Sequence, residues 1–216
     1  MVEKDIQQGL FVGESLSSIY GYKTEGLFVD ETDVESYPDQ QIYDARPGMI
    51  RYKDISGPDE EPDDVVDPEN DRTIIGNEFP TYSYGMGIMA DYKGFDFFVQ
   101  VQGLGGYDRI IGQGQTALYN DYNIQKWHVE NRWTQENPDR NAKYPVLEQL
   151  GISVPWGTMQ SEYWMRDASF LRIKNLQLGY NLPSRILNNT FINKCRVYLS
   201  GQNIYTFDNY YPGYDP

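Results

Sequence analysis

The sequence predicts an all-β fold whose antiparallel strands are long enough to cross a membrane. The clearest sign is a hairpin over 82–104, in which side chains alternate for about ten residues in each arm. A period of two indicates strands, because successive side chains of a strand point to opposite faces. About ten residues is also the length that a tilted strand needs to span the hydrocarbon layer of a bilayer. We therefore predict an antiparallel transmembrane β-barrel fragment of about five strands, with long extracellular loops and a short helix.

One set of alternate positions in this hairpin is apolar and is bounded by aromatic residues. It begins and ends with tyrosine in the first arm, with aliphatic residues between, and it resumes after the Lys93-Gly94 turn. Aromatic residues at both ends of an apolar band are typical of strands in outer-membrane barrels. The residues expected to face lipid are Tyr82, Tyr84, Met86, Ile88, Ala90, Tyr92, Phe95, Phe97, Val99 and Val101. The hairpin alone leaves an alternative, a half-buried hairpin of a soluble β-sandwich, which also alternates.

Three further segments show strand periodicity. They are 10–22, 167–182 and 194–207, and the phase of the second one slips near Asn175, which predicts a bulge or a change of face. A polar turn is expected over 183–193, and a short helix over 117–133, ended before Pro138.

Composition excludes several functions. The net charge of −14 gives no basic patch for the phosphates of nucleic acid. The sequence has no run of 18 apolar residues, so it predicts no membrane-spanning helix. Cys195 is the only cysteine, so no disulfide can form within the chain. The acidic residues of the region rich in tryptophan, such as Glu130, Glu136 and Asp139, show no spacing that indicates a hydrolase pair, and we expect no enzyme activity.

The segment 30–71 is the most acidic part of the chain. It holds 15 of the 32 acidic residues and five prolines and shows no hydrophobic periodicity, so we expect an extended, solvated loop region. From Asp54 to Asp71, counting both, there are nine acidic residues and no basic residue. Closely spaced carboxylates suit a hard cation, Ca²⁺ or Mg²⁺, and the candidate ligands are Asp54, Asp59, Asp67 and Asp71. The alternative is an acidic surface whose charges are screened by water and salt.

The segment 105–166 is a long connection without a clean two-residue period. Such a length is unusual in a compact soluble domain, whereas extracellular loops of outer-membrane barrels are long. It contains the only histidine, His128, which we expect to be solvated. It also contains all four tryptophans, whose faces could stack on sugar rings: Trp127, Trp133, Trp156 and Trp164. A soluble carbohydrate-binding β-domain with aromatic-rich loops is therefore the alternative function.

Several segments, taken together, resemble one family. They are DPENDRTIIGNEFPTYSYG, DYKGFDFFVQVQG, NRWTQENPDRNAKYP, DASFLRIKNLQLGYNLP and RVYLSGQNIYTF…GYDP. They are similar, in the same order, to the C-terminal part of the SusC/RagA family of TonB-linked (TonB-dependent) outer-membrane transporters. The resemblance implies a 22-stranded barrel, of which 1–216 would be the last quarter, without the plug domain and the final strand.

The resemblance also implies a function and partners. The parent protein would take up nutrients, such as glycans, oligosaccharides or peptides, through the outer membrane of a Gram-negative bacterium. It would work with a SusD-like surface lipoprotein and with TonB–ExbB–ExbD, which would act through the N-terminal part. Because external loops of such barrels are long and periplasmic turns are short, we expect 105–166 to be extracellular and Lys93-Gly94 and 183–193 to be periplasmic. Asp54, Asp67 and Asp71 match the family's Ca²⁺-like loop, although a longer acidic insertion replaces its central Asp-Gly. By itself, this chain is expected to be a fragment that does not transport.

Overall fold

The structure is a computed structural model and describes residues 4–5, 10–111, 125–147, 159–188, 191–210 and 213–216. Contacts divide the chain into two compact units. Unit 1 comprises 1–78 and 109–166, and unit 2 comprises 79–108 and 167–216. Each unit is described by itself. Among the described residues, no helix is both long and apolar enough to cross a membrane.

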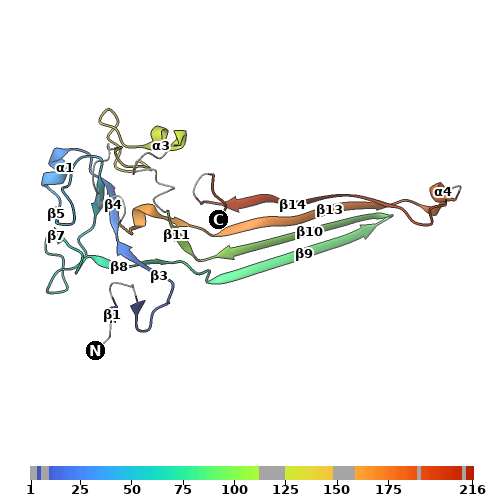
Figure 1. Ribbon diagram of the computed structural model, residues 1–216, viewed down its shortest axis with the longest axis horizontal. Coiled ribbons are helices and arrows are strands. Elements are labelled where there is room, and N and C mark those ends of the chain that lie inside the picture. Colours follow the sequence, from blue (N-terminus) through green and yellow to red (C-terminus); the bar gives the residue numbers. More distant parts are fainter. Residues whose placement is uncertain (1–3, 6–9, 112–124, 148–158, 189–190, 211–212) are drawn as a thin grey trace. The chain divides into compact units, whose positions relative to one another are not determined.

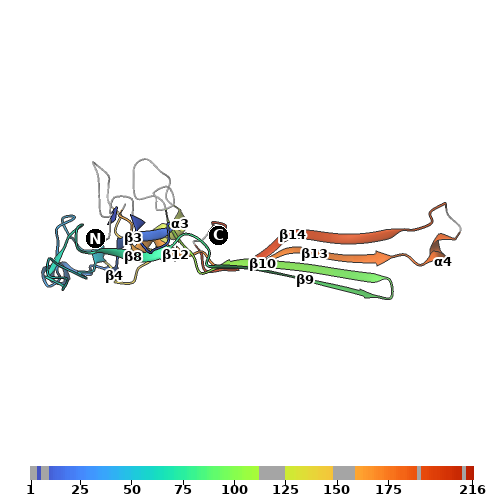
Figure 2. The ribbon, with the colours of Figure 1, turned by 90° about the horizontal axis from the view of Figure 1, so that it is seen from below.

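Unit 2 contains a sheet of four antiparallel strands (Figure 1). The strands are β9 (Tyr82–Tyr92), β10 (Phe95–Gly105), β13 (Phe170–Asn181) and β14 (Arg196–Asp208), in the order β14-β13-β10-β9. Figure 2 shows the same strands running beside one another over their length. The predicted hairpin is confirmed, with Phe95 paired to Tyr92 across the turn. Both turn residues have positive φ, 48° at Lys93 and 91° at Gly94, as a two-residue hairpin turn of type I′ requires.

The predicted irregularity near Asn175 is a bulge. Gln100 of β10 pairs with Asn175, but the next residue, Val101, pairs with Ile173, which leaves Lys174 without a counterpart in the ladder. On the other side, β14 accommodates the same point with an extra residue near Asn203, whose φ is 48°. The extra residue shifts the alternation of β13 by one position. Ile173 and Leu176, which pair with Val101 and Val99, therefore lie on the same face of the sheet. The sheet therefore does not change face along β13.

The connection between β13 and β14 is more ordered than the predicted polar turn. It contains a short helical turn, α4 (Ser184–Leu187), in which Leu187 is buried. Within 183–193, Ile186, Phe191 and Ile192 are also apolar, so the connection is not a uniformly polar turn.

Unit 1 is built from short elements rather than from one sheet. Antiparallel pairs join β3 (Ser18–Tyr22) to β8 (Arg72–Asn77), β4 (Thr24–Leu27) to β6 (Ile50–Tyr52), and β1 (Lys4–Asp5) to β2 (Leu10–Phe11). A parallel pair joins β5 (Asp39–Gln40) to β7 (Val65–Val66). The helical elements are α1 (Glu31–Glu35), α3 (Lys126–Asn131) and the 3₁₀ turn η2 (Glu162–Trp164). A further strand pair joins β11 (Asp108–Ile110) to β12 (Met165–Asp167).

The predicted helix over 117–133 is confirmed only in part. The structure has α3 at Lys126–Asn131, and residues 117–124 lie outside the described part of the chain. The strand expected over 10–22 is interrupted, because β2 ends at Phe11 and β3 begins at Ser18.

The core of unit 1 corrects the interpretation of 30–71 as a solvated loop region. Met49, Ile50, Tyr52 and Val66 are almost completely buried. They pack in one cluster with Tyr22, Leu27, Phe28, Trp133, Ala142, Tyr144 and Trp164. The strands that carry several of these residues, such as β6 and β7, are only three and two residues long, too short for a two-residue or a 3.6-residue period to reveal them.

Candidate functional site

The strand register gathers the ten predicted lipid-facing residues on one face of the sheet in unit 2. Residues that lie directly opposite each other in an antiparallel ladder project to the same side. Val99 lies opposite Ile88 of β9, and Val101 lies opposite Met86. The remaining predicted residues follow the same alternation along β9 and β10. They form the apolar face of the hairpin that the sequence predicted.

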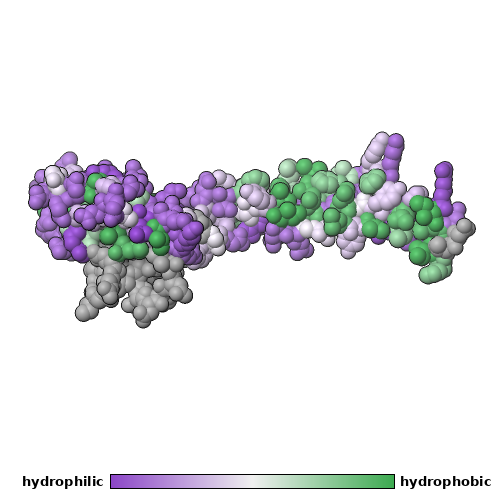
Figure 3. Space-filling model, turned by 90° about the horizontal axis from the view of Figure 1, so that it is seen from above, coloured by the Kyte–Doolittle hydropathy of each residue, from purple (hydrophilic) through white to green (hydrophobic). Residues whose placement is uncertain are grey.

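The same face continues across β13 and β14. Val99 pairs with Leu176 on its other side, and Leu178 pairs with Leu199 of β14. The residues that extend the apolar face are Leu171, Ile173, Leu176, Leu178, Tyr180, Val197, Leu199, Tyr205 and Phe207. Many side chains of the whole apolar face are exposed, including Leu199 at 78% and Ile88 at 49%. Hydrophobic side chains gather along this strand region in Figure 3.

Aromatic side chains occupy both ends of the apolar face. At the end where β9 begins and β14 finishes lie Tyr82, Tyr84, Tyr205 and Phe207, and the rings of the last two are 4.7 Å apart. At the hairpin-turn end lie Tyr92, Phe95 and Tyr180, with the rings of Phe95 and Tyr180 4.5 Å apart. An apolar band with an aromatic girdle at each end matches the lipid-facing surface of an outer-membrane barrel.

Two glycines make room for the tyrosines of the first girdle. A Cβ atom at Gly103 would lie 2.4 Å from the hydroxyl oxygen of Tyr84, and one at Gly105 would lie 2.3 Å from the ring of Tyr82. The tyrosine rings thus cover glycine backbone on the neighbouring strand, an arrangement that protects the ladder from solvent. The Tyr84 hydroxyl donates to the Phe170 carbonyl at 3.1 Å, which also connects β9 across β10 to β13.

The opposite face of the sheet is mostly polar and is held together by side-chain hydrogen bonds. Asn175 Nδ2 donates to Gln100 Oε1 at 2.6 Å, and Arg172 Nε donates to Thr206 Oγ1 at 2.9 Å. Each bond joins neighbouring strands. A sheet with one apolar and one polar face is what a barrel wall between lipid and a polar interior requires.

An ion pair on the polar face reaches across a whole strand. Arg196 of β14 donates through Nε to Asp96 Oδ2 at 2.9 Å, and Asp96 belongs to β10, two strands away. The side chains meet above Gly179 of β13, where a Cβ atom would lie 2.4 Å from the Asp96 carboxylate. Glycine at this position therefore permits the ion pair. Sequence reasoning missed this pair, because its partners are 100 residues apart.

The acidic loop is organised by bonds from backbone amides to carboxylates. Asp71 is fully buried; its Oδ1 accepts from the amides of Ile55 at 2.7 Å and Ser56 at 3.3 Å, and its Oδ2 accepts from Asp67 N at 2.8 Å. Asp67 in turn accepts from the amides of Glu69 and Asn70, both at 2.8 Å. Although burial raises it, hydrogen bonds from Asn70 and Glu69 hold the pKa of Asp67 below its ordinary value.

Asp54 differs from these two carboxylates. Its Oδ2 accepts from the Asp64 amide at 2.7 Å, whereas its buried Oδ1 has no hydrogen-bond partner. Burial raises the pKa of Asp54, and the neighbouring charges of Asp71 and Asp63 raise it further. A cation would compensate such a carboxylate.

The four predicted metal ligands do not converge. In the described part of the chain, no three Asp, Glu, His or Cys side chains lie together in a way that could hold a metal ion. Calcium takes six to eight oxygens, and the oxygens of Asp67 and Asp71 are already engaged with amide groups. The loop as arranged therefore does not fit Ca²⁺ or Mg²⁺, and metal binding stays a prediction from the sequence.

The tryptophans predicted to bind substrate are placed differently. Trp133 and Trp164 are 6% and 2% exposed and belong to the core of unit 1, so their faces are not available to a ligand. Trp127 is half-buried and packs against the same core, and Trp156 lies outside the described residues. The stacking prediction is therefore wrong for Trp133 and Trp164, because their ring faces pack inside the core of unit 1.

His128 is buried rather than solvated. Its ring stacks on Tyr144 at 4.5 Å between centroids, and burial lowers its pKa. Both residues lie in unit 1, and nothing in this arrangement indicates a catalytic role.

Comparison with known proteins identifies the class. No family model matches the chain. It is 30% identical over 204 residues to TonB-dependent receptor P3 of Formosa agariphila, covering 94% of this chain and 19% of that protein. It is also 30% identical over 238 residues to TonB-dependent receptor P39 of the same organism, covering 94% of this chain and 22% of the relative. The chain thus spans about a fifth of the length of these relatives.

Solved structures agree on the fold. The RagAB peptide importer in its open-open state superposes with a TM-score of 0.60 at 21% identity, covering 92% of this chain and 19% of that one. The RagAB peptide transporter gives a TM-score of 0.59 at 20% identity, covering 89% and 19%. The sequence similarity and the fold together support the predicted class, the TonB-dependent receptors. With the motifs quoted above, the chain corresponds to part of a transporter of the SusC/RagA type, as the sequence predicted.

Proposed function

We propose that this chain forms part of the wall of an outer-membrane transporter for nutrient uptake in a Gram-negative bacterium. The observation that carries the proposal is the apolar face of the four-stranded sheet, with aromatic side chains at both of its ends. The strands are 11 to 13 residues long, which suffices to cross the hydrocarbon layer when they are tilted. The polar face would line the interior of the barrel.

The soluble carbohydrate-binding alternative is less well supported. A soluble sheet buries its apolar face against a second layer, yet Leu199 and Met86 are 78% and 58% exposed. The aromatic-rich connection supplies no exposed tryptophan platform at Trp133 or Trp164. Lipid is the solvent that accommodates such a face without a second protein layer.

Transport itself requires more than these strands. β9 and β14 are the edges of the sheet, and backbone groups at an open edge cannot remain unsatisfied in hydrocarbon. Closure of a barrel therefore requires pairing with further strands. We propose that the complete protein closes around this sheet and that the chain by itself does not transport.

We infer the substrate class and the partners from the family. The solved structures are described as a peptide importer, which supports peptides as cargo, and oligosaccharides are the alternative cargo class. A SusD-like lipoprotein would cover the outer side, where we place 105–166. Energy would come from TonB–ExbB–ExbD on the inner side, where Lys93-Gly94 and 183–193 would lie.

Cysteine labelling tests the location and the topology. In a Cys195→Ser background of the complete gene product, Glu136→Cys probes the long connection and Lys93→Cys probes the hairpin turn. A membrane-impermeant maleimide applied to intact cells is expected to label the Glu136→Cys variant and to leave the Lys93→Cys variant unlabelled. Both should react after permeabilisation. Labelling only at the Lys93 position on intact cells would reverse the topology, and recovery of the protein outside the outer-membrane fraction would refute the function.

A further inference from the structure

The connection between β13 and β14 has an unusual composition for this chain. The segment 182–195 contains two basic residues, Arg185 and Lys194, and no acidic residue, although the whole chain has 32 acidic and 18 basic residues. It also exposes large apolar side chains, with Phe191 at 96% and Ile186 at 61%. Exposure of these two side chains to water is unfavourable, because both have a large apolar surface.

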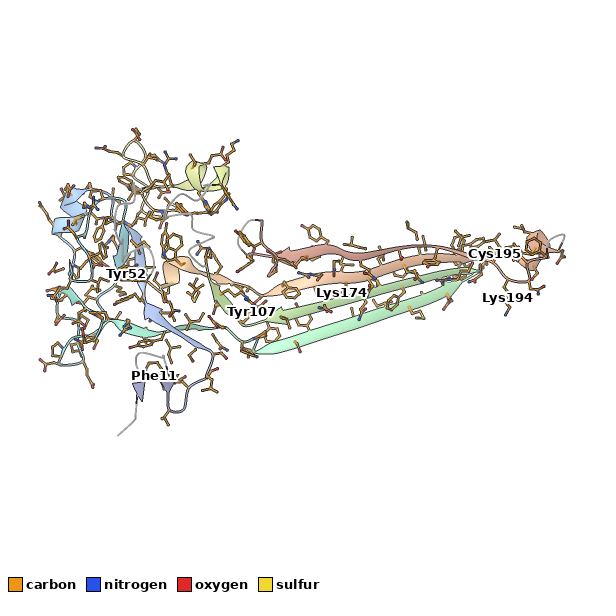
Figure 4. All side chains as sticks on the ribbon, viewed as in Figure 1. Phe11, Tyr52, Tyr107, Lys174, Lys194 and Cys195 are labelled. Atoms are coloured by element: carbon orange, nitrogen blue, oxygen red, sulfur yellow. The ribbon has the colours of Figure 1, made fainter. Side chains whose placement is uncertain are left out.

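This connection lies at the same end of the sheet as the β9–β10 turn. The amide of Asn181 donates to the Gly94 carbonyl at 2.7 Å, and the amide of Leu182 donates to the Cys195 carbonyl at 2.9 Å. The turn contributes a third basic residue, Lys93, whose ammonium lies 5.1 Å from the centre of the Tyr92 ring. Figure 4 shows Lys194 and Cys195 at this end. We call Lys93, Arg185, Ile186, Phe191 and Lys194 the turn-end surface.

The turn-end surface continues directly into an aromatic girdle. Tyr92, Phe95 and Tyr180 close the apolar face at this end, and Figure 3 shows a second group of hydrophobic residues at the end that carries α4. If the apolar face lies in hydrocarbon, the next layer beyond the girdle is the headgroup region. Residues with apolar bodies and cationic ends are favoured there, since their stems contact acyl chains while the charge meets phosphate.

We propose that the turn-end surface inserts into the phospholipid headgroup layer on the side of the short connections. Ile186 and Phe191 would enter between the upper parts of the acyl chains, and Lys93, Arg185 and Lys194 would pair with lipid phosphates. This inference rests on the proposed function, because it requires the sheet to span a bilayer. It adds a lipid contact that fixes the depth of this end of the barrel.

The charges favour lipid over a second copy of this chain as the occupant. Two copies meeting at this surface would bring their basic residues together, because the two acidic residues at this end, Asp91 and Asp96, already interact with Arg196. A phosphate layer complements all three cations at once. The shared chemistry of aliphatic, aromatic and cationic side chains matches the composition of membrane-interface segments.

Fluorescence quenching of a label at Phe191 tests the proposal. The complete gene product with Phe191→Cys, in the Cys195→Ser background, is labelled with bimane and reconstituted in vesicles of phosphatidylglycerol and phosphatidylcholine. Lipids brominated near the headgroup are expected to quench the label more strongly than lipids brominated near the chain ends, and aqueous iodide should quench it weakly. Ile186→Cys provides a second site if Phe191→Cys folds poorly.

Two further positions separate the possible results. Ile88→Cys, on the apolar face, should be quenched most by lipids brominated near the chain ends, and Asp59→Cys, in the acidic loop, only by iodide. If the Ile88 label responds as expected but the Phe191 label is quenched only by iodide, the turn-end surface lies in water and the inference is wrong. Protection of the Phe191 label from both quenchers would indicate a protein partner and would also overturn it. If even the Ile88 label is insensitive to lipid, the proposed function fails as well.

Discussion

Replacing Ile88 by arginine tests whether the apolar face lies in lipid. Ile88 pairs with Val99 in the ladder and lies one residue from Gly87, the middle of β9. A strand rises about 3.4 Å per residue, so on a tilted strand the side chain would lie about 3 Å from the midplane of the apolar band. The band is about 25 Å tall, which places Ile88 deep within it.

The expected cost follows from this depth. An arginine on the lipid face near the midplane destabilises an outer-membrane barrel by about 2–4 kcal/mol. The neighbouring residue provides the matched control, because Met89 pairs with Phe98 and projects to the opposite, mostly polar face at nearly the same depth. Met89→Arg is expected to cost less than about 1 kcal/mol, since its charge can be hydrated in the barrel interior.

Equilibrium unfolding of the complete protein in phosphatidylcholine vesicles measures both changes. Urea or guanidinium titrations, followed by tryptophan fluorescence and by the gel-mobility difference between folded and unfolded barrel, give the free energy of unfolding for each variant. Ile88→Arg should show the larger loss. Equal losses in the two variants, or a larger loss in Met89→Arg, would refute the assignment of the apolar face to lipid.

Four more predictions concern polar groups and the glycine that one of them requires. Asp71→Ala leaves three backbone amides without their acceptor and should lower the free energy of unfolding by about 3 kcal/mol in a denaturant titration. Asp71→Asn should give a value between those of the wild type and Asp71→Ala, and an unchanged midpoint in Asp71→Ala would contradict the structural role. Because the pKa of Asp54 is raised on folding, the stability of the protein should fall as pH rises through that pKa. Asp54→Asn should therefore stabilise the protein at about pH 7 and have little effect at about pH 3. A stability difference that does not depend on pH would contradict this prediction. From the arrangement of the loop, we expect that added Ca²⁺ does not raise the melting temperature of the wild type. A rise in the wild type that is absent in Asp54→Asn would show that the metal predicted from the sequence binds. Gly179→Val should separate Asp96 from Arg196 and lower the melting temperature, and an equal effect of Gly179→Val in an Asp96→Asn background would show that the ion pair is not the cause.

The strands of unit 2 could be predicted because their signal is local. Alternation in β9 and β10, with Gly94 in the turn between them, defines a hairpin without any information from distant residues. The quoted motifs identified the family for the same reason, since they are continuous stretches of sequence. The bulge at Lys174 was only half predicted: the sequence showed the slip in phase, and the pairing with Gln100 and Val101 decided that the face is conserved.

Unit 1 depended on tertiary structure. Tyr52 and Val66 lie in strands of only three and two residues, and they are buried in one cluster with residues far along the chain, such as Trp133 and Trp164. The composition of 30–71 is acidic and rich in proline, which indicates solvation on average but says nothing about the few apolar side chains that pack inward. The same long-range packing removed Trp133 and Trp164 from the candidate binding surface.

By itself, the sequence determined the class of protein, the hairpin and the residues of its apolar face, because periodicity and motifs are properties of neighbouring residues. Only the tertiary structure decided which polar groups meet. Asp96 reaches Arg196 across Gly179, and Asp71 accepts hydrogen bonds from two backbone amides that are 15 and 16 residues away in the sequence. Such contacts depend on strand register and loop closure, which couple residues distant in sequence and therefore leave no local pattern.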